Sequence, residues 1–327
     1  MKRVVSWACM AVLAGIVSAT AQPADQAAPP AAAPAAAIPA TPAAAAAAPA
    51  APDYSQVEEV STDLGKGLFM IVGAGGNTTL AVGSKGLIVV DTQFAPLYDK
   101  LRAKITSISD KPIQYVINTH YHGDHTGGNA LFFEKDMAVI VAHPKVAEHM
   151  LKPPPGANGQ PGTPAVDDAL PNAPYGGDGT VLDVGISALL SHPAPAHTDG
   201  DTIVSFLNAD VIATGDTVTT ASYPNIDVAG GGTIDGMIAA AKFVIAQSDN
   251  KTKIVPGHGP LTNRAGVMEY RDMLQTARDR IAKAKAGGMT EQQVVDANLL
   301  TDLDKRWKPA GNAIAARFPI NIYRSLK

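Results

Sequence analysis

The run His120-Tyr121-His122-Gly123-Asp124-His125 gathers three histidines and one aspartate within six residues. Clustered imidazole rings need partners for their ring nitrogens, and a divalent cation suits a neutral imidazole well. The alternative is a histidine-bearing surface loop that binds nothing. A solvated loop seldom collects these side chains so densely, so the run predicts a metal site.

Further candidate ligands follow apolar segments elsewhere in the chain. Three such segments are predicted to be strands that lead into a ligand: Ile113–Ile117 before His120, Val211–Ala213 before Asp216, and Lys253–Val255 before His258. A fourth ligand, His197, precedes another strand-like run at residues 202–207. Strands can deliver side chains from distant positions to one rim of a sheet, so we expect these ligands to meet there.

The spacing H-x-H-x-D-H resembles the metallo-β-lactamase superfamily when it is combined with His197, Thr214-Gly215-Asp216-Thr217 and Pro256-Gly257-His258-Gly259. The resemblance extends over nearly all of residues 57–265. It implies an α/β fold, the four-layer αββα sandwich, with the metal site at the rim between two packed sheets. It also implies a dinuclear centre: His120, His122 and His197 hold one metal, Asp124, His125 and His258 hold the second, and Asp216 bridges them.

The ligand chemistry supports hydrolysis. A catalytic zinc ion takes three protein ligands and keeps a position for water, so seven ligands with one shared carboxylate fill two such sites. The first predicted function is a zinc-dependent hydrolase that uses a metal-bound hydroxide to cleave an ester, thioester, lactone or lactam bond. Asp124 is the predicted catalytic residue, because it could aim the hydroxide and pass a proton to the leaving group. Nitrogen and oxygen ligands favour two zinc ions per chain but also accept iron or manganese.

Two departures from the family's pattern bear on the substrate. The only cysteine, Cys9, lies in the predicted leader, so no sulfur ligand is expected at the second metal. Residues 217–241 contain no lysine or arginine, whereas several β-lactamases of this superfamily hold the substrate carboxylate with a basic residue there. Arg264 is a candidate replacement. A true β-lactamase and a non-catalytic metal-binding protein are therefore kept as alternatives.

Four other residues are predicted to contact the substrate. Tyr121 and Asn129 lie close to the histidine motif in the sequence, and Tyr223 and Asn225 follow Asp216. A phenol or an amide at these positions could donate a hydrogen bond to a developing oxyanion, although packing and turn roles are equally compatible with them. Structural roles are expected for the acidic residue at the end of an apolar strand and for the remaining histidines: Asp91, His143, His149 and His192.

The N-terminal region carries no such motif. Residues 1–21 are predicted to be a signal peptide, because Lys2 and Arg3 precede an apolar stretch that ends in the small residues Ala19-Thr20-Ala21. That stretch is shorter than the roughly 20 residues of a membrane span. No integral membrane span is therefore expected, and the mature protein is expected to be periplasmic or secreted. Residues 22–53 are rich in alanine and proline, which predicts a mobile, extended linker. Residues 54–327 are assigned to the hydrolase domain.

Charge restricts the partners. The net charge is −4, and basic residues cluster only in the mixed segment 271–285, which argues against nucleic acid because that binding depends on neutralising phosphates. The expected partner is a small-molecule substrate, and no obligatory protein partner is evident.

Periodicity predicts the remaining elements. Strands are expected at 67–72, 78–82, 86–90, 138–141, near 181 and at 187–190. Helices are expected at 97–108, after Thr126, and at 144–151, 234–246, 263–286 and 313–327, with a capping box at Thr290 and Gln293. Residues 152–179 are rich in proline and glycine and are predicted to be a long surface loop.

Overall fold

Apolar and β-branched segments form two sheets in the computed structural model, which describes residues 52–155, 159–177, 179–309 and 311–327. The predicted signal peptide and residues 22–51 of the predicted linker lie outside these described residues. The first sheet has the strand order β1 (Val60–Gly65), β2 (Leu68–Val72), β3 (Thr78–Val82), β4 (Leu87–Val90), β5 (Ile113–Ile117), β6 (Val139–Ala142) and β7 (Ala173–Pro174). The second has the order β13 (Thr262–Asn263), β12 (Lys253–Val255), β11 (Val211–Ala213), β10 (Ile203–Phe206), β9 (Ser187–Ser191) and β8 (Thr180–Asp183).

Strand direction changes within both sheets. Strands β1 to β4 form an antiparallel meander, and β4 to β7 are parallel. In the second sheet β11 and β12 are parallel, while β8 to β11 and the pair β12 and β13 are antiparallel. Parallel neighbours bring their C-terminal ends to one edge. The loops that follow β4 and β5, and those that follow β11 and β12, therefore leave each sheet together.

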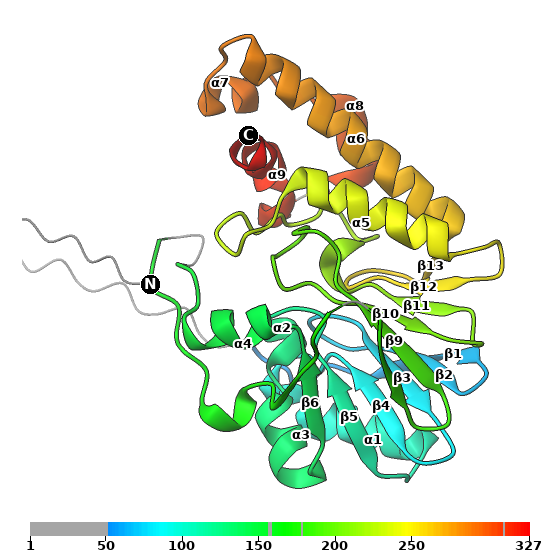
Figure 1. Cartoon of the computed structure of the whole chain (residues 1–327). Helices are drawn as coiled ribbons and strands as arrows, with labels where there is room; N and C mark the ends of the chain where they lie inside the picture. Colours follow the sequence, from blue (N-terminus) through cyan, green and yellow to red (C-terminus); the bar gives the residue numbers. More distant parts are fainter. Residues whose placement is uncertain (1–51, 156–158, 178, 310) are drawn as a thin grey trace, which may run out of the picture. The chain divides into compact units, whose positions relative to one another are not determined.

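Helices cover the outer faces of both sheets (Figure 1). The helices of the described residues are α1 (Tyr98–Ile108), α2 (Gly123–Thr126), α3 (Asn129–Asp136), α4 (Pro144–Leu151), α5 (Ile234–Gln247), α6 (Arg264–Ala286), α7 (Glu291–Asp296), α8 (Thr301–Trp307) and α9 (Ala313–Ser325), with short 3₁₀ helices η1 (Ala95–Leu97), η2 (Asp167–Ala169) and η3 (Gly215–Thr217). Helices α1 and α3 pack on the first sheet, and α5 and α6 pack on the second. Among the described residues, no helix has both the length and the apolar character needed to cross a membrane.

Hydrophobic clusters between these layers hold the region 52–327 together. One cluster packs α1 against the outer face of the first sheet and buries Leu101 and Val89. A second lies between the two sheets and buries Ile88 against Val204. A third packs α5, α6 and α9 on the second sheet and buries Tyr270. The predicted αββα sandwich is therefore confirmed.

Four segments differ from the sequence prediction, and the shortest is β13, whose two residues pair with β12 where a helix was expected to begin. Strand β1 was not expected, because it is a largely exposed edge strand in which Leu64 is the buried residue. The predicted surface loop 152–179 contains η2 and β7, and β7 pairs with β6 through two residues. Helix α8 was missed because its sequence is mostly polar and charged and only Trp307 in it is buried. A weak apolar pattern accounts for each of these differences.

Candidate metal centre

The predicted ligands come together from separate segments at the edge where β5, β11 and β12 end. His120 and His122 lie between β5 and α2, Asp124 and His125 lie in α2, His197 lies before β10, Asp216 lies in η3, and His258 follows β12. Their donor atoms form three groups, each with all atoms within 4.8 Å of one another and able to hold a metal ion: His120, His122 and His197; His120, His125 and Asp216; and Asp124, His125 and His258.

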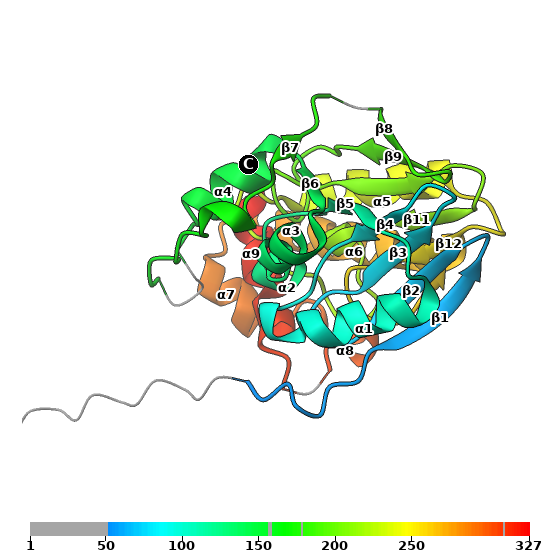
Figure 2. The ribbon, with the colours of Figure 1, turned by 90° about the horizontal axis from the view of Figure 1, so that it is seen from below.

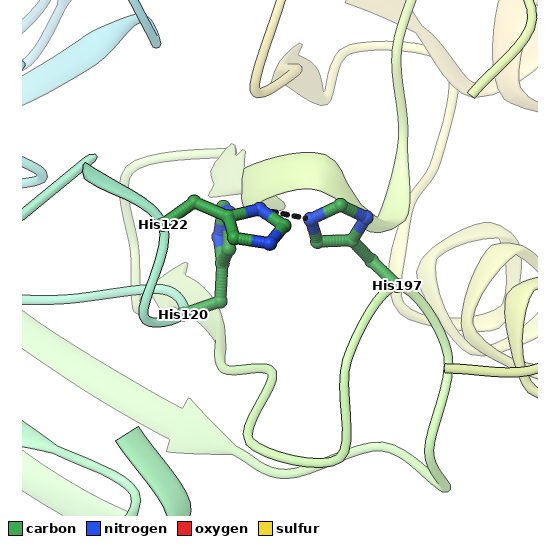
Figure 3. Close-up of side chains that lie close together, drawn as sticks. All are labelled: His120, His122 and His197. Atoms are coloured by element: carbon green, nitrogen blue, oxygen red, sulfur yellow. Dashed lines mark hydrogen bonds between the residues drawn. The ribbon is translucent and has the colours of Figure 1, made fainter. Parts of the chain in front are cut away.

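The first histidine group presents three ring nitrogens to a common point. His122 Nδ1 lies 3.1 Å from His120 Nε2 and 3.0 Å from His197 Nε2. Figure 3 shows the rings of His122 and His197 turned toward one another from two separate segments, with the ring of His120 beside that of His122. Unprotonated ring nitrogens arranged in this way can donate their lone pairs to one divalent cation.

The second group lies beside the first, and Asp216 faces both. His258 Nε2 lies 3.3 Å from His125 Nε2 and 3.2 Å from Asp124 Oδ2. Asp216 Oδ1 lies 3.3 Å from His125 Nε2 and 3.4 Å from His258 Nε2, whereas its Oδ2 lies 3.6 Å from His197 Nε2. One carboxylate therefore presents one oxygen to each group, as the predicted bridging role requires.

Asp91 orients two of the rings from behind. Its Oδ2 accepts hydrogen bonds from His125 Nδ1 at 2.7 Å and from the Thr119 hydroxyl at 2.7 Å. That hydroxyl lies 3.0 Å from His120 Nδ1, and because it donates to Asp91 it accepts from the ring. Both Nε2 atoms are thus left free of hydrogen for a metal. Asp91 Oδ1 also accepts the Thr119 backbone N–H at 2.8 Å, in keeping with the turn role predicted for it.

Two further carboxylates support the other rings and were not anticipated. Asp227 Oδ2 lies 3.0 Å from His122 Nε2 and directs Nδ1 of that ring to the centre. The Asn225 carbonyl does the same for His197, because it lies 2.9 Å from Nδ1. Asp201 is buried and accepts the backbone N–H of His197 at 2.7 Å. The position of Asp201, four residues after His197, could have indicated that it supports this ligand. No local sequence pattern links Asp227 to His122.

The pKa values of the carboxyl groups and histidines at the site favour the binding of cations. Burial works to raise the pKa of Asp124, but the neighbouring His125 and His258 outweigh it and hold the pKa at about 2. The negative charge of Asp216, opposed by burial, raises the pKa of His258 to about 10. Burial, together with its histidine neighbours, lowers the pKa of His120 well below the usual value. Burial also works to raise the pKa of Asp216, but His258 and His125 outweigh it and hold that pKa well below its usual value. Asp124 and Asp216 are thus ionised, and cations at the centre would compensate their charge.

The residues present fit a pair of divalent ions. The donor set consists of imidazole nitrogens and carboxylate oxygens, which zinc accepts and which iron and manganese also accept. Within the described part of the chain, the buried Asp216 Oδ1 has no hydrogen-bond donor. A bound cation would satisfy this oxygen.

Two glycines allow the backbone to approach the ligands closely. A Cβ atom at Gly257 would lie 1.9 Å from Asp216 Oδ1, and one at Gly76 would lie 2.2 Å from the His125 ring. Atoms cannot approach that closely. A side chain at either position would therefore displace a predicted ligand.

Two adjoining cavities open beside the centre. The first has a volume of about 530 Å³ and is lined by Asp124, Asp216 and His258 together with residues 219, 221–225, 312 and 314. The second has a volume of about 720 Å³ and is lined by the loop around Asp227 and by α9. His122, Asn225 and Ile314 line both cavities. A molecule could therefore extend from the metal centre into the second cavity.

The four residues predicted to contact the substrate differ in whether they line the two cavities. Asn225 lines both cavities, and Tyr121 lines the second, where its hydroxyl donates to Asp227. Tyr223 borders the first cavity, but its hydroxyl donates to Asp304 at 3.0 Å and points away from the metal centre. Asn129 does not line either cavity: it is fully buried and its amide bonds to Asn118 at 2.9 Å. The expectation for Asn129 is wrong, because this amide pair joins α3 to the end of β5.

Other predicted residues lie apart from the ligand groups. Arg264, the candidate replacement for the missing basic residue, donates to the Ile245 carbonyl at 3.2 Å and lines neither cavity. His149 stacks on Tyr121, its Nε2 lies 2.6 Å from Asp199 Oδ1, and it lines neither cavity. His143 and His192 stack on each other at 3.8 Å.

Comparisons with known proteins agree with this geometry. The sequence model of a family described as the metallo-beta-lactamase superfamily matches residues 71–258. The 2,4-dinitroanisole O-demethylase subunit alpha of Nocardioides sp. (strain JS1661) is 32% identical over 181 residues, which are 54% of this chain and 51% of that protein. The chain thus spans about half the length of this curated relative.

Solved structures share the fold at low sequence identity. The stereoselective inverting sec-alkylsulfatase Pisa1 from Pseudomonas sp. is similar with a TM-score of 0.63 and 15% identity, over 82% of this chain and 50% of that chain. A metallo-β-lactamase from Cronobacter sakazakii (Enterobacter sakazakii) with a HARLDQ motif is similar with a TM-score of 0.57 and 20% identity, over 70% of this chain and 96% of that chain.

Proposed function

Because the chain belongs to the metallo-β-lactamase superfamily, we propose that it is a metal-dependent hydrolase of a small-molecule substrate, with two zinc ions at the centre. The observation that carries this proposal is the convergence of the seven donors, with Asp216 facing both groups. Asp91 and Asp227 support the proposal, because they contact the ring nitrogens that face away from the centre. Asp91 contacts His125 directly and His120 through the Thr119 hydroxyl. Asp227 contacts His122. Iron or manganese would fit the same donors.

The chain's own residues would divide the work at the centre. His120, His122 and His197 would hold one ion, and Asp124, His125 and His258 the other, with Asp216 between them. Such ions supply Lewis-acid polarisation of the substrate and a water activated for attack near neutral pH. Asp124 is ionised and lines the first cavity, so it can accept a proton from an attacking water and return it to a leaving group. This makes Asp124 the proposed catalytic residue.

The bond that is cleaved belongs to the proposal as well. We propose the carbonyl of an ester, thioester, lactone or lactam, because the first cavity gives a substrate access to the proposed base Asp124 and to the proposed ligands Asp216 and His258. A β-lactamase role has less support, since no lysine or arginine lines the first cavity among the described residues. The similar proteins are named for an O-demethylase, a sec-alkylsulfatase and a β-lactamase, so sulfate esters and aryl ethers belong in a substrate test.

Export to the periplasm or the medium is also part of the proposal. It rests on the leader-like composition of residues 1–21.

Metal analysis combined with a substrate panel tests the function. Purified protein is expected to hold two zinc equivalents and to cleave at least one member of a panel of esters, thioesters, lactones, a chromogenic cephalosporin, alkyl sulfates and nitroaryl ethers. Chelation should abolish that cleavage, and added zinc should restore it. Protein that holds two metal ions but cleaves no member of the panel would favour the alternative of a non-catalytic metal-binding protein.

A further inference from the structure

The C-terminal helix α9 forms one wall of the second cavity. One stripe of α9 lines that cavity at intervals of three or four residues, and an adjoining stripe is buried in the core: Ile314, Arg317, Asn321 and Arg324 line it, and Ala315, Phe318 and Ile322 are buried. Side chains at this spacing share one side of a helix. In two views α9 lies on the side of the molecule that carries α2 and α4 (Figure 1, Figure 2).

Packing fixes α9 in this position. Phe318 stacks on Tyr223 with ring centroids 4.5 Å apart, which joins α9 to the segment that follows Asp216. Lys285 of α6 donates to the carbonyls of Tyr323 at 2.9 Å and Leu326 at 2.6 Å. Helix α9 also lies beyond residues 71–258, which the family model matches. This wall therefore lies outside the segment that the family model describes.

The charged residues that line the second cavity differ in whether they have hydrogen-bonding partners. Arg324 is paired with Glu291 through two hydrogen bonds of 2.7 and 2.6 Å. Asp227 is occupied by His122, by Tyr121 and by the Gly230 backbone N–H. Arg317 has neither an ion pair nor a side-chain hydrogen bond within the described residues. In the described part of the chain, the exposed Arg317 is thus a cation without a protein partner, and it lines a cavity that adjoins the one at the metal centre.

We propose that Arg317 determines specificity by binding an anionic group, a carboxylate or a sulfate, at the end of the substrate remote from the reacting bond. The bond itself would lie in the first cavity, and the body of the substrate would pass Ile314 and Asn225, which line both cavities. The planar guanidinium offers paired donors that match the oxygens of such an anion. The inference rests on the proposed hydrolase function and names its substrate class as elongated anions.

The basic residue thus comes from α9 and not from the segment after Asp216. Residues 217–241 contain no lysine or arginine, and Arg264 is directed to the Ile245 carbonyl. An anion held by Arg317 lies beside His122 and Asp227, on the side of the first metal group. This placement orients the substrate with its uncharged end toward Asp124 and His258.

A matched pair of esters tests the role of Arg317. The substrates are 4-nitrophenyl hexanoate, which is neutral, and the mono-4-nitrophenyl ester of adipic acid, which has a similar length and ends in a carboxylate. Arg317→Met should raise KM for the adipate ester about tenfold, the effect of losing one charge-assisted hydrogen bond. It should leave kcat, and KM for the hexanoate ester, within about twofold. Arg317→Lys should recover part of the loss because it keeps the charge.

The control is Arg271→Met. Arg271 pairs with its neighbour Asp272 and lines neither cavity, so this variant should treat both esters as the wild type does. An equal change for the two esters in Arg317→Met, or no change for either, would overturn the proposal. Thermal unfolding of each variant checks that the fold is retained.

A binding measurement separates this inference from the proposed function. Zinc-loaded wild-type protein and Arg317→Met are titrated calorimetrically with adipate and, separately, with sulfate. Weaker binding to the variant supports the anion site, and the tighter of the two anions identifies its preference. Equal binding to both proteins overturns the anion site. If neither these esters nor any member of the substrate panel is cleaved but binding depends on Arg317, the hydrolase proposal fails and the anion site stands. Cleavage of both esters without dependence on Arg317 gives the reverse result.

Discussion

Side chains around His122 illustrate how the ligands and their supports differ in sequence. The ligand run 120–125 is local, so its chemistry is visible in six consecutive residues. Asp227 supports His122 from 105 residues away, and only the folded loop after Pro224 brings the two together. Arg317 is farther still along the chain. Local spacing therefore predicted the candidate ligands, whereas their supports and the anion-binding residue depend on long-range packing.

Replacing His122 tests the ligand assignment directly. His122→Ala removes a nitrogen donor from the first group, so we expect one metal equivalent to be lost and activity to fall by at least about 100-fold. Metal content is measured by elemental analysis after gel filtration. His192→Ala is the matched control, because His192 stacks on His143 outside the ligand groups. Two metal equivalents and full activity in His122→Ala would contradict the assignment.

Replacing Asp227 tests its supporting role. Asp227→Ala leaves every proposed ligand in place but frees the His122 ring to rotate, so metal affinity should fall about 10- to 100-fold while metal at saturating concentration restores much of the activity. Competition with a chromogenic chelator measures the affinity. Asp235→Ala, at an exposed ion pair with Arg278, should leave the affinity unchanged. If Asp227→Ala binds metal as tightly as the wild type does, the carboxylate does not orient the ring.

Elements with strong periodicity were predictable, and weak or short ones were not. Strands β5, β11 and β12 have the predicted bounds, as does α4, because each is a run of apolar residues with clear ends. The capping box that starts α7 was also predicted and is confirmed. The polar edge strand β1, the short β7 and the charged helix α8 carry little apolar pattern, and partners elsewhere in the fold stabilise them.

Helix α9 depends on one aromatic anchor. Phe318 is fully buried and stacks on Tyr223, so Phe318→Ala should cost about 3 to 5 kcal/mol of unfolding free energy and loosen the wall of the second cavity. Urea denaturation measures the cost. Phe133→Ala is the control, because Phe133 is 37% exposed on α3 and its removal should cost about 1 kcal/mol or less. Equal costs for the two variants would mean that α9 contributes little to the folded state.

The layered arrangement joins the metal centre to global stability. The proposed ligands lie on loops and short helices that follow strands of both sheets. Asp216, which follows β11 of the second sheet, faces His125, which follows β5 of the first sheet. The αββα order was predictable because the strands and helices occur in blocks along the chain, and the family resemblance specified how the blocks pack. What the pattern could not specify was the C-terminal wall of the second cavity, since its place depends on contacts such as those of Lys285 with the end of α9.

Metal removal should therefore lower the stability of the whole fold. Each ion that binds the native state and not the unfolded chain contributes about 2.7 kcal/mol at a free concentration 100 times its dissociation constant. For a domain of this size that corresponds to roughly 5 to 10 °C in the unfolding midpoint. Calorimetric scans of zinc-loaded and chelator-treated protein measure the shift, and magnesium, which prefers oxygen ligands, should not replace zinc.

Without bound cations the ionised Asp124 and Asp216 remain close together across the junction of the two sheets, so the loss of stability should appear in a single cooperative transition. An unchanged midpoint after complete removal of metal would show that the seven donors do not bind cations in the folded protein.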